Sequence, residues 1–107
     1  MKKLIVAALF LPSVAMANFE TGNSLYAGLT SHELVSRMVG LGYVKGVFDA
    51  HLGSSICTPD DGGNITAGQV SDIVLRHLRN TPEHRNYPAN YLVVSALSQV
   101  WPCGKRM

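Results

Sequence analysis

The longest helical pattern in the sequence covers residues 29–52, which read LTSHELVSRMVGLGYVKGVFDAHL. Its apolar residues recur at steps of three and four over about five turns, which is the period of an amphipathic α-helix. They are Leu34, Met38, Leu41, Val44, Phe48 and Leu52. A second set widens the apolar stripe: Val35, Val39, Val47 and Ala50. We therefore predict a helix over residues 31–52 that is central to the fold and buried on more than one side.

A capping box opens this predicted helix. The Thr30 hydroxyl is placed to accept the amide of Glu33, and the Glu33 side chain to reach back to Thr30. Leu29 stands at the position of a hydrophobic staple. The preceding residues, 18–29, show no pattern that assigns them to a helix or a strand.

Three glycines interrupt the predicted helix, at Gly40, Gly42 and Gly46. Each costs about 1 kcal/mol of helix stability relative to alanine. They do not form the glycine fingerprint of a nucleotide-binding loop, because no strand precedes them and the spacing differs. Gly42 and Gly46 are four residues apart and share one helix face. We predict that they allow the close approach of another helix, from this chain or from a second subunit.

A loop of 13 residues, 53–65, follows the first helix, and loops of this length are often functional. It carries Asp60, Asp61 and Asn64 beside a Thr-Pro-Asp-Asp-Gly turn. The acidic pair does not predict a metal site, because the alternating oxygen ligands and closing Glu of a calcium loop are absent. Two interpretations stay open: a solvated turn, or a recognition loop presented to a partner.

The rest of the chain predicts further helices. Thr66 and Gln69 form a second capping box, and the apolar spacing after it indicates a helix over residues 67–79. A single helical turn begins near Pro82, and a last helix spans residues 88–101. No segment shows sustained strand alternation. We predict an all-α fold: a compact bundle of about three main helices, a short helical turn and one disulfide.

The first 17 residues have the pattern of a secretory signal peptide. Lys2 and Lys3 precede the apolar run Leu4–Leu11, and a small-x-small triplet places the expected cleavage after Ala17. The apolar run is too short to span a membrane, which takes ~20 residues. Removing residues 1–17 leaves a single domain, 18–107, in which seven basic residues balance seven acidic ones. A neutral domain lacks the positive field that nucleic-acid binding requires.

Two cysteines, Cys57 and Cys103, remain after cleavage. An even pair in a small exported domain indicates one disulfide. Two free buried thiols are the alternative, and a catalytic cysteine is disfavoured because no base is arranged near either one. The bridge would close a loop of about 47 residues and stabilise the fold by ~4 kcal/mol in the chain-entropy account.

A mixed basic cluster follows the second predicted helix, and Arg79, His84 and Arg85 are its candidate partner-binding residues. Cations at a helix C-terminus also interact favourably with the helix dipole, so a purely structural role is the alternative. No nucleophile, base and acid are arranged for catalysis, and no histidine pair has metal-ligand spacing. The sequence therefore predicts no enzyme activity, no metal and no cofactor.

Ordered segments of the chain resemble the Rap/Tai immunity proteins of bacterial type VI secretion. In chain order they are Gly22-Asn23-x-Leu25, Gly42-Tyr43-Val44-Lys45-Gly46-Val47-Phe48-Asp49-Ala50, Cys57-Thr58-Pro59, Ile65-Thr66-Ala67-Gly68-Gln69, Thr81-Pro82-Glu83-His84-Arg85, Pro88-Ala89, Leu92-Val93-Val94-Ser95-Ala96-Leu97 and Trp101-Pro102-Cys103. Members often carry a second cysteine pair, but the corresponding neighbourhoods here hold Gly28 and Gly40. That second bridge is therefore absent.

The resemblance implies a small periplasmic helical protein, often a homodimer, without catalytic activity. It implies that the protein binds a cell-wall amidase effector and occludes its active site. Within that expectation, Asp60, Asp61 and Asn64 are the candidates for contact with the effector's cleft, because pre-ordering of their loop lowers the entropic cost of binding.

Two other classes of function remain open at this point. One is a phage- or plasmid-borne periplasmic inhibitor of lysis or superinfection, which would also bind and block. The other is a periplasmic chaperone of the acid-stress kind, although such proteins are usually rich in charge and only 15% of this chain is charged. Suppression of aggregation at low pH, without one preferred partner, would indicate the chaperone.

Overall fold

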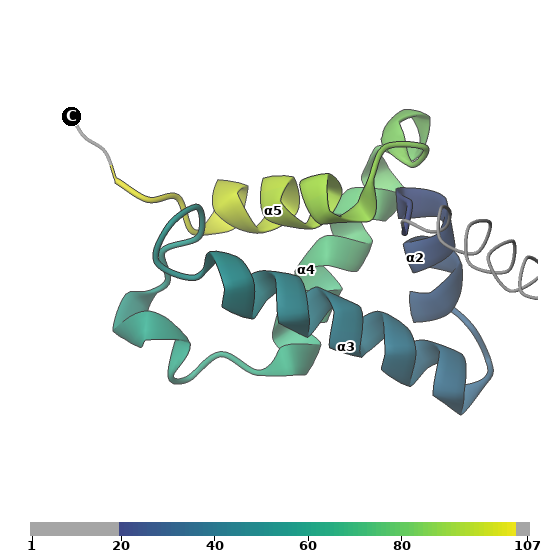
Figure 1. The fold of residues 1–107 in the computed structure, drawn as a ribbon, viewed down its shortest axis with the longest axis horizontal. Coiled ribbons are helices and arrows are strands. Elements are labelled where there is room, and N and C mark those ends of the chain that lie inside the picture. Colours follow the sequence, from purple (N-terminus) through teal and green to yellow (C-terminus); the bar gives the residue numbers. More distant parts are fainter. Residues whose placement is uncertain (1–19, 105–107) are drawn as a thin grey trace, which may run out of the picture.

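The computed structural model describes residues 20–104 and shows them as a helical domain (Figure 1). Its α-helices are α2 (Gly22–Leu29), α3 (Leu34–His51), α4 (Ala67–Asn80) and α5 (Ala89–Val100), with short 3-10 helices η1 (Pro59–Gly62) and η2 (Pro82–His84). The all-α prediction is confirmed, with α2 as an addition to the three main helices predicted. The predicted signal peptide, residues 1–17, lies outside the described residues.

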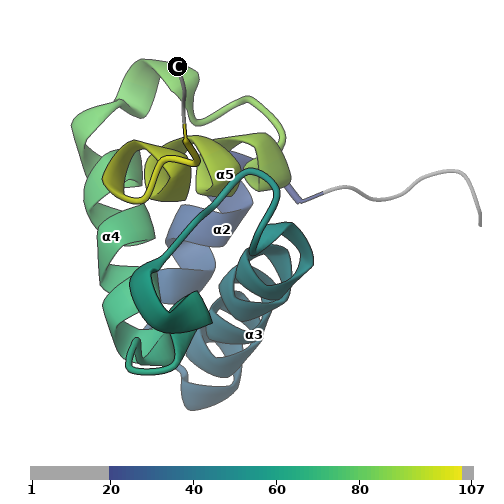
Figure 2. The same cartoon turned by 90° about the vertical axis from the view of Figure 1, so that its left-hand side faces the viewer.

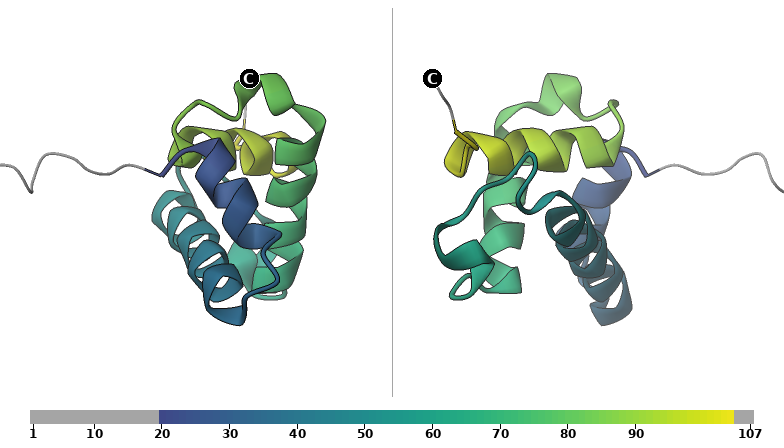
Figure 3. Two further views of the ribbon diagram at one scale, coloured as in Figure 1. Left: turned by 90° about the vertical axis from the view of Figure 1, so that its right-hand side faces the viewer. Right: turned by 60° about the vertical axis from the view of Figure 1, so that its left-hand side comes forward.

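The four α-helices of the described region enclose one apolar core. Helices α3 and α5 both pack on α4, and α2 covers one end of the bundle in contact with the other three (Figures 2 and 3). The buried apolar side chains come from every helix and from the loop after α3: Leu25, Val44, Phe48, Ile56, Val70, Val74, Leu78, Ala89, Leu92, Val93, Ala96 and Leu97. No helix in residues 20–104 combines the length and the apolar character needed to cross a membrane.

Helix α2 forms in the segment that showed no clear sequence pattern. Its N-cap, Thr21, makes a capping box with Ser24 in place of the usual Glu or Gln. Tertiary contacts then hold the helix: the Gly22 amide donates to the Tyr87 carbonyl at 3.0 Å, and the Asn23 amide donates to the Arg85 carbonyl at 2.7 Å. A side chain at Gly22 would meet Leu92 and the Arg85 carbonyl, so only glycine fits this approach of α2 to the η2–α5 connection.

One predicted cap is confirmed and the other is wrong. Thr66 and Gln69 form the capping box that opens α4. Thr30 does not open α3; it ends α2, where its hydroxyl donates to the Tyr26 carbonyl at 2.7 Å. Helix α3 begins only at Leu34, and its N-cap Glu33 makes no side-chain capping bond. The preceding helix has already engaged the Thr30 hydroxyl.

The prediction that the first helix is buried on more than one side is also wrong. Gly40, Val44 and Phe48 are its buried residues, all on one face. In the first two turns of α3, apolar side chains that no other helix of residues 20–104 covers lie in solvent: Leu34 (63% exposed), Val35 (72%), Met38 (58%) and Val39 (66%). Periodicity shows which residues share a face, but it does not show whether another element covers that face.

Candidate functional site

The loop after α3 is anchored at several points along its length. At its start, the His51 carbonyl accepts the amides of Ser54, Ser55 and Ile56 at 3.0–3.1 Å. The Ile56 side chain is fully buried in the core. These contacts fix the path of the chain as it leaves α3.

The predicted disulfide between Cys57 and Cys103 is present, with the two Cα atoms 4.8 Å apart. Beside it, the Cys57 amide donates to the Trp101 carbonyl at 2.9 Å. Trp101 in turn packs edge-on against Phe48 of α3, with ring centroids 6.3 Å apart. The bridge therefore fastens the middle of the loop to the end of α5 and, through Trp101, to α3.

Beyond the bridge, η1 forms the most projecting part of the loop. Asp60 is exposed and adopts a left-handed backbone conformation, with φ 57°. Its carbonyl accepts the Gly63 amide at 2.8 Å, and its carboxylate lies 3.5 Å from the Asn64 amide nitrogen. The structure thus brings Asp60 and Asn64 together on one exposed turn. The side chain of Asp61 lies outside what the structure describes.

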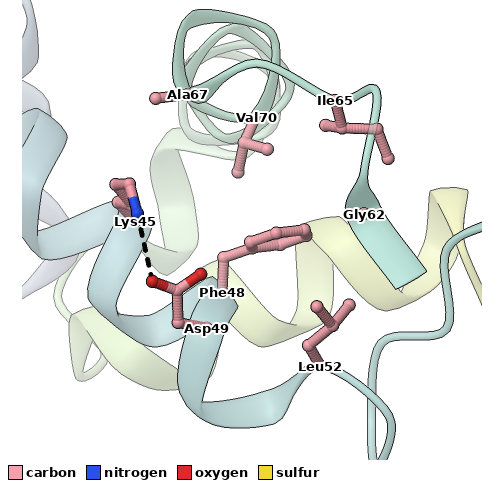
Figure 4. Close-up of a pocket in the computed structure, with 8 residues that line it drawn as sticks. All are labelled: Lys45, Phe48, Asp49, Leu52, Gly62, Ile65, Ala67 and Val70. Atoms are coloured by element: carbon pink, nitrogen blue, oxygen red, sulfur yellow. Dashed lines mark hydrogen bonds and ion pairs between the residues drawn. The ribbon is translucent and has the colours of Figure 1, made fainter. Parts of the chain in front are cut away.

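A hollow of about 190 Å³ lies between this turn, the C-terminal half of α3 and the start of α4 (Figure 4). Phe48 of α3 and Leu52, which follows the end of that helix, face Ile65 and Val70 across it. Gly62, with φ +82°, borders it, and a side chain there would contact both Phe48 and Leu52. Glycine at this position therefore keeps the hollow open as well as permitting the turn.

An ion pair borders the hollow on α3. Lys45 and Asp49 are one helical turn apart, and their charged atoms are 3.2 Å apart. Both side chains are more than half exposed, so the pair adds little stability but places one charge of each sign at the mouth. The hollow thus offers an apolar floor and a polar rim, the arrangement that accepts a protruding side chain of a partner.

The residues that line the hollow were not among the candidates drawn from the sequence. Lys45 and Asp49 have the spacing of a helical ion pair, a signal that sequence alone provides. No sequence spacing indicates that Phe48 and Val70 face each other, because that depends on how α3 packs against α4.

The basic cluster divides between solvent and the interior. Arg79 is exposed and His84 is half-buried. Arg85 is directed into the molecule: its Nε donates to the Leu78 carbonyl at 2.9 Å, and its guanidinium lies 4.1 Å from the centre of the Tyr26 ring. Arg85 therefore joins α2 to the end of α4, a structural role that leaves less of its guanidinium for a partner.

The predicted loop residues and the basic cluster do not form one surface. The loop leads into the start of α4, and the cluster lies at its end. A helix of that length spans about 20 Å. A partner that contacts the loop would therefore reach Arg79 and His84 only by extending along α4.

The glycines of α3 at Gly42 and Gly46 face away from the bundle. A Cβ atom added at either position would meet no other part of the described chain within 4 Å, so no helix of residues 20–104 approaches them. Gly40 is the glycine in close internal contact, against Leu29 of α2. Gly42 and Gly46 therefore do not serve the approach of a helix from the described part of this chain. The approach of a helix from a second subunit stays a prediction.

Among residues 20–104, no three His, Cys, Asp or Glu side chains gather as a group that could hold a metal ion. A family model described as Rap1a immunity proteins matches residues 21–103. No curated protein sequence matches the chain.

Proposed function

Because the chain belongs to the Rap1a immunity protein family, we propose that it is a periplasmic, non-catalytic protein that binds a secreted cell-wall amidase effector and blocks its active site. The family match carries the proposal, since an immunity protein acts by binding its effector. The N-terminal pattern of a signal peptide supports the periplasmic location, where an enzyme that attacks the cell wall would act.

The stapled loop, residues 53–65, is the part that we assign to the effector's cleft. It projects from the bundle, yet the disulfide, the buried Ile56 and the amides around His51 hold its base. A rigid loop loses little conformational entropy on insertion, so more of the contact energy appears as affinity. The left-handed backbone at Asp60 fits this assignment, because such conformations cluster at functional sites.

Removing the acidic charges of the loop is expected to weaken binding of the effector by about tenfold or more. Charges that are paired and desolvated in an interface slow dissociation, so their loss speeds it. The variant carries Asp60→Asn and Asp61→Asn. Asparagine tolerates the left-handed conformation of Asp60, so the backbone of the loop is preserved. Affinity is measured by calorimetry against the purified amidase effector.

Asp72→Asn is the matched control, since Asp72 is an exposed acid on α4 that lies outside the loop. The Asp72→Asn variant should bind the effector with the same affinity as the unsubstituted protein. Equal affinity for the doubly substituted loop would show that the loop carboxylates do not contact the effector, and the assignment of this loop would then be wrong.

We also propose that the outer face of α3 joins two copies of the chain. Val35, Val39, Gly42 and Gly46 succeed one another at steps of four, three and four, which places them along one face. The two valines are exposed and the two glycines face open space. An apolar stripe with small residues permits close contact between two helices.

Val39→Asp is expected to convert the protein from a dimer to a monomer in sedimentation analysis, because it places two charges in the centre of that contact. Val39 is 66% exposed, so the monomer itself should keep its stability. Val100→Asp on α5 introduces the same charge at another exposed valine and should leave the dimer intact. A monomeric unsubstituted protein, or an unaffected dimer in the variant, would refute this interface.

A further inference from the structure

A second, larger hollow lies at the other end of α4, away from the stapled loop. It has a volume of about 570 Å³, within the roughly 300–1,000 Å³ of small-molecule sites, whereas three other hollows on this surface measure 140–240 Å³. The end of α4, the η2 turn and one side of α5 line it. Its lining residues are His77, Asn80, Thr81, His84, Tyr87, Tyr91, Leu92, Ser95 and Gln99.

Three aromatic rings form a continuous row along this groove. His84 and Tyr87 are stacked with centroids 5.1 Å apart, and Tyr87 and Tyr91 are tilted with centroids 5.9 Å apart. Tyr91 is 57% exposed, so much of its surface is open to solvent. These rings are not needed to fill the core, because both tyrosines lie outside the buried cluster.

The polar groups of the groove have hydrogen-bonding capacity to spare. Within the described residues, the Asn80 amide, the Tyr87 and Tyr91 hydroxyls and the two imidazoles make no side-chain hydrogen bond. Gln99 makes one weak contact, with its amide nitrogen 3.5 Å from the Ser95 hydroxyl. Burial, and secondarily the nearby His84, lower the pKa of His77. His77 is therefore neutral around pH 7 and able both to donate and to accept.

We propose that this groove binds a saccharide of one or two pyranose rings. One face of a pyranose is a row of C–H groups that stacks on the negative face of an aromatic ring, and its edge carries hydroxyls that pair with amides, imidazoles and phenols. The Tyr91 ring, which is 57% exposed, supplies the stacking surface, and Asn80, His77 and Gln99 supply the donors and acceptors.

The lining argues against the other ligand classes. None of the residues that line the groove is an Asp, Glu, Lys or Arg, so the groove holds no permanent charge to pair with a charged ligand such as a phosphate. A protein partner would insert an apolar anchor into a desolvated pocket. The one aliphatic side chain in the groove, Leu92, is only 2% exposed, so the groove has no aliphatic floor to receive such an anchor.

The test is an NMR titration of the isotope-labelled protein with two neutral probes, the N-acetylglucosamine trimer and maltotriose. We expect saturable shifts of the Asn80, Tyr91 and Gln99 amides, with a dissociation constant on the order of 1 mM for at least one probe. A response to the acetamido sugar alone would show that the amide side chains of the groove recognise its acetamido groups. A response to both probes would assign recognition to hydroxyls. Either pattern supports the groove as a saccharide site.

Tyr91→Ala is expected to weaken that binding about fivefold to tenfold, because it removes the most exposed ring of the row. Met38→Ala truncates an equally exposed side chain on α3 and should change nothing. Absence of shifts with both probes, or an unchanged dissociation constant in Tyr91→Ala, would overturn the proposal. The sugar titrations contain no effector, so their outcome is independent of the proposed immunity function.

Discussion

Replacing Cys57 and Cys103 by serine is expected to lower the free energy of unfolding by about 4 kcal/mol. The bridge closes 46 residues of separation, and the chain-entropy account gives that value for a loop of this size. A domain of this size has only about 5–15 kcal/mol of stability in total. The same change frees the middle of the stapled loop from the end of α5, so affinity for the effector should fall together with stability.

Thermal unfolding of the purified double variant measures this effect. A loss of about 4 kcal/mol corresponds to a fall of the melting temperature by roughly 15–30 °C in a domain of this length. Reductant should reproduce the fall in the unsubstituted protein and have no further effect on the double variant, which is the control for the chemistry. Equal melting temperatures with and without the bridge would contradict its assigned role in holding the loop.

Leu25→Ala is expected to cost about 2–5 kcal/mol, the range for removing a buried leucine side chain. Leu25 is fully buried, and it is the residue by which the eight-residue helix α2 enters the core. A helix this short does not persist on its own propensity, so its packing decides whether it forms. Denaturant unfolding of the variant gives the free energy directly.

Leu34→Ala is the matched control for this prediction, because the same atoms are removed from a leucine that is 63% exposed. Measured at a concentration where the chain is monomeric, it should change stability by less than about 0.5 kcal/mol. A similar effect of the two substitutions would mean that α2 is not part of the folded core.

Features that depend on local sequence could be predicted well. The Thr66–Gln69 capping box lies within four residues, and it correctly placed the start of α4. The disulfide followed from two cysteines and a predicted export signal, and the long loop followed from its turn residues. In each case a short stretch of chain, or simple chemistry of the compartment, is sufficient.

Features that depend on packing could not be predicted. Helix α2 is held by backbone hydrogen bonds from Gly22 and Asn23 to residues more than 60 positions away. Thr30 fits equally well as the start of one helix or the end of another, and only the presence of α2 decides between them. The hollow beside Phe48 exists because two helices and a turn meet there, which no single segment of sequence encodes.

The exposed half of α3 also shows that burial cannot be predicted from an apolar pattern alone. Its apolar residues indicated burial, but in the single chain they lie in solvent. In the proposed dimer, the apolar period of these residues marks an interface between two copies and not the core of the domain. The distinction requires knowing what covers the face, and a hydrophobic period is the same in both cases.

The activity of a captured partner tests the proposed immunity function. The tagged, disulfide-bonded protein is used to capture binding proteins from a periplasmic extract, and the captured protein is assayed for hydrolysis of amide bonds in peptidoglycan with and without the immunity protein. We predict one dominant partner that is an amidase, inhibited completely at stoichiometric ratio and bound more weakly by the Asp60→Asn, Asp61→Asn variant than by the unsubstituted protein. Capture of many unrelated proteins, or an amidase whose activity is unchanged in the complex, would contradict that function.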